Sequence, residues 1–81
     1  MKYDEFKNIM ISDGWSEDRW SHLKFSNASG KLFRIKNQKI SIRFEICGKM
    51  GGKNEWFKIW SGYKKNLSED IVDKIKDRID R

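Results

Sequence analysis

Cysteine, histidine and long apolar runs are scarce in this sequence of 81 residues, and each scarcity excludes a class of protein. The single cysteine, Cys47, excludes an intramolecular disulfide framework and a zinc site built on cysteines. His22 is the single histidine, and with Cys47 as the one cysteine the sequence has too few such side chains for a typical transition-metal site, so we expect a surface or sheet-edge histidine and no cofactor. No apolar run is long enough to span a bilayer, and no apolar region of the signal-peptide type follows Met1 and Lys2. We therefore expect a cytoplasmic protein without membrane contact.

Catalytic motifs are also missing. We find no nucleophile elbow, no paired carboxylates at a recognisable spacing and no metal motif. The glycine-rich segment 48–52 matches no phosphate-binding fingerprint, because such fingerprints need a helix after the loop and a strand is expected here. We interpret this segment as a hairpin tip. The alternative is a basic finger that contacts a nucleic-acid backbone. We do not expect an enzyme. A small basic ribonuclease using His22, Arg43 and Tyr63 stays open as an alternative, although nothing in their spacing singles them out.

The length and composition indicate one folded domain over residues 1–81. A chain of this size buries only about 60% of its unfolded surface, so a large internal active-site cavity is not expected. Hydrophobic residues make up 37% of the chain, but aromatic residues alone account for 14%, so a few large side chains can build the core.

Hydrophobic spacing predicts a helix near each end of the chain. Apolar residues in segment 3–11 recur at intervals of three and four, and Gly14 is suited to end that helix in the left-handed conformation. In segment 67–79, Ser68 is suited to cap a helix with an apolar stripe, and acidic residues in its first turn complement the helix dipole. Residues 15–20 are expected to form a single helical turn, with Trp15 filling the core.

Alternation of apolar and polar residues predicts four strands, over residues 21–25, 31–36, 39–47 and 55–63. The short connections between them favour an antiparallel meander. Two short helices can cover only one face of such a sheet. The expected fold is therefore an α+β domain with a short N-terminal helix, a four-stranded antiparallel sheet and a C-terminal helix, both helices packed on one sheet face.

The two faces of the predicted sheet differ in chemistry. The apolar face is expected to carry Phe33, Ile35, Ile40, Ile42, Phe44, Ile46, Phe57 and Ile59. The opposite face is expected to stay open to solvent and to carry the candidate binding residues Lys24, Arg34, Lys36, Arg43, Trp56, Lys58 and Trp60. Cations that follow phosphates, together with rings on which bases stack, are typical of single-strand-binding surfaces.

Charge is concentrated on the same part of the chain. The net charge is +6, and residues 21–65 hold eleven Lys/Arg against two Asp/Glu, whereas the segments on either side are mildly acidic. A basic middle between acidic ends attracts a polyanion to the sheet. We expect a small basic nucleic-acid-binding domain that prefers single-stranded DNA or RNA to duplex.

A protein-interaction module is the alternative. Exposed aromatic residues beside arginine are also typical of protein hot spots. Such a module would be a small inhibitor or accessory subunit of the kind that mobile elements carry, binding an acidic protein through the Trp/Arg face. A homodimer joined through the sheet belongs to the same alternative.

The segment 58–79, a basic strand that leads through Leu67 and Ser68 into a helix, is similar to part of the PC4-like and Pur-type single-strand binders. Those proteins combine a curved four-stranded antiparallel sheet with a C-terminal helix, so the resemblance implies the same architecture and single-strand binding. The order of helix, sheet and helix is also similar to that of double-stranded RNA-binding domains, which have three strands and lack the aromatic fourth strand expected here.

Overall fold

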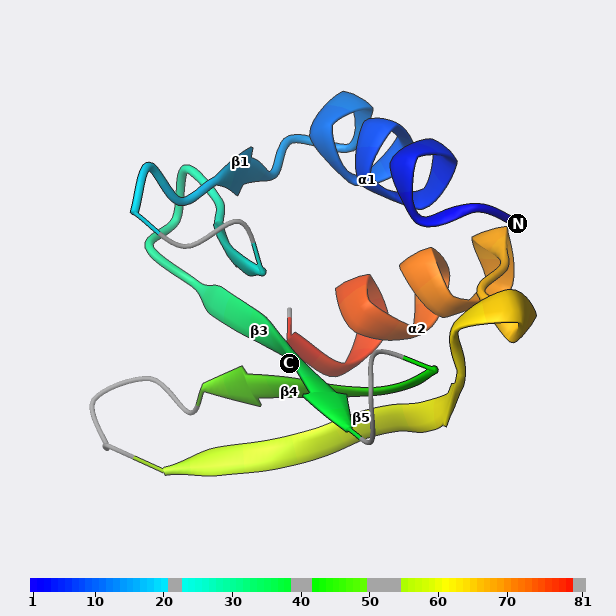
Figure 1. Cartoon of the computed structure of the whole chain (residues 1–81). Helices are drawn as coiled ribbons and strands as arrows, with labels where there is room; N and C mark the ends of the chain where they lie inside the picture. The colour runs from blue at the N-terminus through cyan, green and yellow to red at the C-terminus, as the bar shows by residue number, and fades with distance from the viewer. Residues whose placement is uncertain (21–22, 39–41, 50–54, 80–81) are drawn as a thin grey trace.

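Helix, antiparallel sheet and helix follow one another as the sequence pattern predicts (Figure 1). The computed structural model describes residues 1–20, 23–38, 42–49 and 55–79. Its elements, in chain order, are α1 (Tyr3–Ser12), β1 (Ser16–Glu17), β2 (Lys24–Ser26), β3 (Leu32–Gln38), β4 (Arg43–Lys49), β5 (Trp56–Tyr63), the 3-10 turn η1 (Lys64–Asn66) and α2 (Glu69–Ile79). The α+β class, the meander and the two flanking helices are therefore confirmed.

The sheet has five strands in the order β1-β2-β3-β4-β5, one more than predicted. The additional strand is β1, where the sequence suggested a helical turn. Ser16 and Glu17 pair with β2, and the Asp18 amide donates a hydrogen bond to the Lys24 carbonyl at 2.7 Å. These cross-strand bonds satisfy the local backbone, so the extended form is preferred over an isolated turn. Trp15 is 4% exposed and belongs to the core, as predicted.

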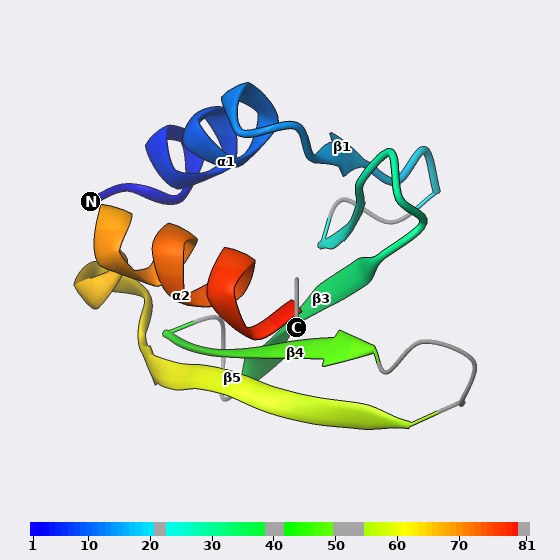
Figure 2. The ribbon, with the colours of Figure 1, turned by 180° about the vertical axis from the view of Figure 1, so that it is seen from behind.

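Both helices lie on the same side of the sheet (Figure 2). Helix α2 packs against β4 and β5, and α1 packs against α2 and β1. The core between these layers contains Phe6 and Met10 from α1 and an isoleucine-rich stripe from α2. Aromatic rings fill the other end, where Phe33 stacks on Phe25 at 4.9 Å and meets Trp15 edge to face at 4.7 Å. Among the described residues, no helix lies on the opposite side of the sheet.

Two glycines end elements where the backbone turns. Gly14 has φ +101°, and the following Trp15 amide donates to the Met10 carbonyl at 3.1 Å, so α1 ends in the left-handed conformation that its sequence predicts. Gly30 has φ +79° in the turn between β2 and β3, where the Asn27 side chain accepts amide hydrogen bonds from Ser29 and Lys31 at 3.0 and 2.9 Å. Both turns are set by local sequence.

A β-bulge in β5 changes the side on which one predicted binding residue lies. Trp60 pairs with Ile46 and Lys58 pairs with Cys47, so Ile59 is an extra residue with no counterpart on β4. In such a bulge two successive side chains turn to nearly the same side of the sheet. Ile59 is buried, and Trp60 is half-buried against the core. The prediction that Trp60 shares a face with Trp56 and Lys58 is therefore wrong.

The start of β4 also departs from the predicted pattern. Ile42, expected on the apolar face, is 58% exposed because it precedes β4 at the end of the sheet, beyond the cover of α2. Residues 39–41, which include the predicted core residue Ile40, lie outside the described residues. Residues 50–54, which belong to the predicted hairpin tip, also lie outside them. No helix among the described residues is long and apolar enough to cross a bilayer.

Candidate nucleic-acid interface

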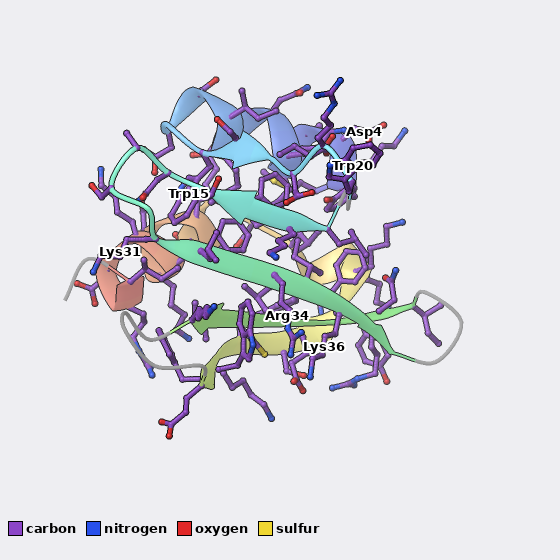
Figure 3. The ribbon with its side chains drawn as sticks, turned by 90° about the vertical axis from the view of Figure 1, so that its left-hand side faces the viewer. Asp4, Trp15, Trp20, Lys31, Arg34 and Lys36 are labelled. Atoms are coloured by element: carbon purple, nitrogen blue, oxygen red, sulfur yellow. The ribbon has the colours of Figure 1, made fainter. Side chains whose placement is uncertain are left out.

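The open face of the sheet is the one that no helix covers. Figure 3 views the molecule from this side, with Arg34 and Lys36 on the sheet in front of the helices. Directly paired residues of neighbouring strands point to the same side of a sheet, and sides alternate along each strand. By this rule the register and the bulge assign to the open face Lys24, Arg34, Lys36, Arg43, Glu45, Cys47, Lys49, Trp56, Lys58, Ser61 and Tyr63. Six of the seven predicted binding residues are therefore together, and Trp60 is the exception.

Three cations of the open face stand in one row across the sheet. Lys24 of β2 pairs with Arg34 of β3, Arg34 pairs with Cys47 of β4, and Cys47 pairs with Lys58 of β5. Neighbouring strands are about 4.8 Å apart, so this row, called the Lys24–Lys58 row, spans roughly 14 Å. It crosses the strands at right angles, and Glu45 borders it at Cys47 and Lys58.

Arg34 and Trp56 reach toward each other across β4. The Arg34 guanidinium carbon lies 4.1 Å from the centroid of the Trp56 ring, a cation–π stack. Cys47, the direct strand partner of Arg34, is 4% exposed. Burial, and secondarily the hydrogen bond from its Sγ to Glu45 Oε1 at 3.4 Å, raises the pKa of the Cys47 thiol. The thiol is thus a covered part of the sheet, not a reactive nucleophile.

A second arginine–aromatic stack lies at the other end of β4. The Arg43 guanidinium carbon is 4.8 Å from the Tyr63 ring centroid, and the Lys65 ammonium is 5.8 Å from it. Tyr63 is 45% exposed. Neither Tyr63 nor Lys49 is among the candidate binding residues that the sequence predicts for this face. Continuing the alternation past Cys47 would have found Lys49, but Tyr63 returns to the open face only because of the bulge.

Glu45 lies between the two stacks. It is the one carboxylate among the described strand residues of the open face, and its side chain is only 17% exposed. Lys58 Nζ is 3.9 Å from Glu45 Oε2, and Lys36 is its direct partner on β3. Six cations against one carboxylate leave the face strongly positive. The positive potential is therefore reduced around Glu45, including at Lys58, and it is higher at the cations farther from this carboxylate.

The structure describes two of the three residues that the ribonuclease alternative would use. Arg43 and Tyr63 pair directly across β4 and β5, but His22 lies outside the described residues. Within the described ranges no three His, Cys, Asp or Glu side chains are grouped to hold a metal ion.

Comparisons with protein-family models, curated proteins and solved structures find no significant match to this chain. The similarity of segment 58–79 to single-strand binders therefore stays a prediction, and the function is inferred from the open face itself.

Proposed function

We propose that the protein binds single-stranded nucleic acid on the open face. The observation that carries the proposal is the gathering of six lysines and arginines, two of them stacked on aromatic rings, on the one sheet face that no helix covers. Phosphates release counterions when lysine and arginine neutralise them, which favours binding regardless of sequence. The protein acts as a binding module, not an enzyme, and we place it in the cytoplasm.

The stacked pairs favour a single strand over a duplex. A guanidinium or aromatic plane binds a base through the flat face of that base. In a duplex these faces are stacked inside and are accessible only at the ends. The open face also presents no protruding helix to enter a major groove, which is the common way of reading duplex DNA. Arg34 with Trp56, and Arg43 with Tyr63, are therefore suited to unpaired bases.

Fluorescence anisotropy with a labelled oligothymidylate, titrated at about 50 and about 200 mM salt, tests the proposal. Changing three lysines of the open face to alanine, Lys24, Lys36 and Lys58, should weaken binding. The log–log salt slope should fall by about 0.7 for each phosphate that the variant no longer neutralises.

The matched control removes the same charge from the helix side of the molecule, where Lys2, Lys74 and Lys76 are exposed. This variant should keep the slope of the unchanged protein, because its lysines do not face the strand. Equal slopes for the two triple variants, or no binding of the unchanged protein at about 50 mM salt, would contradict the proposal.

A protein partner is the second candidate function. A groove of about 880 Å³ lies where the first turn of α1 meets the ends of β4 and β5. Its apolar lining includes Tyr3, Ile42 and Tyr63, and Lys64 and Lys65 flank it. Asp4 and Glu5 also line the groove, so it suits an apolar side chain of a partner flanked by residues of both charges. Absence of oligonucleotide binding in the anisotropy experiment would leave this candidate, and light scattering during size-exclusion chromatography would show whether a second copy is the partner.

A further inference from the structure

The cations of the open face are unevenly arranged with respect to Glu45. Along β4, a path from Cys47 to Arg43 passes directly over Glu45, so a phosphate backbone that followed the strands would approach a carboxylate. Across the sheet, the Lys24–Lys58 row offers three cations, and Glu45 lies beside only its β4–β5 part, where Oε2 is 3.9 Å from Lys58 Nζ. The row's length of roughly 14 Å corresponds to about four nucleotides of a stacked strand, whose rise along the axis is ~3.4 Å per nucleotide. Electrostatics therefore favours the path across the strands.

An exposed tryptophan stands at the β2 end of this row. The Asp18 amide bonds to the Lys24 carbonyl at 2.7 Å and closes the loop between β1 and β2, on which Trp20 lies. The Asp18 side chain accepts the Trp20 amide hydrogen bond at 2.7 Å, which orders the backbone there. Trp20 is 88% exposed, and Arg19 lies 5.7 Å from its ring centroid. Figure 3 shows Trp20 near the same edge of the sheet.

An indole so exposed adds nothing to the core and costs solubility. Beside a row of cations it has the composition of a stacking platform, since base–aromatic stacking accepts any base. The aromatic ring of Trp56 lies over Arg34, the middle cation of the row. The two indoles thus provide two ring planes along one cationic line.

We infer that the bound single strand crosses the β-strands along the Lys24–Lys58 row and stacks a base on Trp20 at its β2 end. This inference rests on the proposed function and adds to it the direction of the strand and a binding residue outside the sheet. Lys36 and Arg43, although on the same face, lie off the path.

Lys58 and Lys36 provide a matched pair for the test, because both are exposed lysines that flank Glu45 on the open face. Anisotropy titrations use an oligothymidylate of about 16 nucleotides, the upper end of common single-strand site sizes. Lys58→Ala should reduce the salt slope by about 0.7, as should Lys24→Ala, whereas Lys36→Ala should leave the slope unchanged. An equal decrease in slope for Lys58→Ala and Lys36→Ala would overturn the path.

Trp20→Ala tests the end of the path. Removal of one stacked base should weaken binding by about fivefold or more, without changing the salt slope. Ile11→Ala removes another exposed apolar side chain, from the helix side, and should not change affinity. Unchanged affinity of Trp20→Ala would overturn its role. Failure of the unchanged protein to bind would instead refute the proposed function, so the two failures are distinguishable.

Discussion

Replacing Gly62 by alanine tests where the Trp60 ring lies. A Cβ atom added at Gly62 would stand 2.7 Å from Cζ2 of Trp60, 3.0 Å from Cη2 and 3.3 Å from Cε2. All three atoms belong to one rigid ring, so the whole indole has to move. The ring is packed against the core, where displacement costs about 1–3 kcal/mol.

Backbone propensity acts in the opposite direction. Alanine in an element interior is favoured over glycine by roughly 0.5–1 kcal/mol, and Gly62 is not one of the two described glycines with positive φ. The net expectation is a decrease of about 1–2 kcal/mol in the free energy of unfolding. For a domain of this size each kcal/mol lowers Tm by about 4–8 °C. Thermal unfolding followed by circular dichroism measures this shift without depending on tryptophan emission.

Two comparisons make the Gly62→Ala result specific. Ser61→Ala, at the neighbouring position on the open face, should change the free energy of unfolding by less than about 0.5 kcal/mol. In a Trp60→Ala background the clash is absent, so Gly62→Ala should become stabilising by about 0.4–1 kcal/mol. If Gly62→Ala is neutral or stabilising with Trp60 present, the indole does not lie over Gly62 and this packing of Trp60 is refuted.

Two further predictions concern groups whose pKa is raised. Burial, and then the nearby charges of Glu17 and Asp4, raises the pKa of Tyr3 from 10.0 to about 12, so the unfolded chain loses this proton first and the free energy of unfolding should fall as pH rises from 10 toward 12. Denaturant titrations should show a smaller fall in Tyr3→Phe, and an identical fall would contradict the assignment. Because Cys47 is covered and its pKa is raised, mainly by burial, a thiol reagent should modify it slowly, and Trp56→Ala should speed the reaction; equal rates would show that the Arg34–Trp56 stack does not cover the thiol.

Local patterns in the sequence were sufficient for most of the fold. The spacing of apolar residues in α1 and α2 is the helical repeat, and these positions are buried where the pattern expects them. Strict alternation in β3 and β4 assigns Arg34, Lys36 and Arg43 to one face and the apolar residues to the other. These features depend on neighbours within a few positions, which is why a single sequence contains them.

Tertiary structure decided which aromatic residues share the open face. A bulge inserts one residue without a local signal in the sequence. Alternation therefore predicted Trp60 on the open face, whereas the structure has Tyr63 on that face and Trp60 on the other. Pairing with β2 likewise turned Ser16 and Glu17 into a strand, although their own sequence favoured a helix start. The Lys24–Lys58 row is also a product of register, because its members come from three strands and no spacing along the chain relates them.

The sequence by itself determined the element types, the buried stripe of each helix and the excess of positive charge on the central strands. The packed chain alone decided that Trp60 contacts the core and that three cations from separate strands align. The physical reason is that side-chain periodicity is a property of one segment, whereas strand register and bulges minimise the free energy of the whole sheet against its helices.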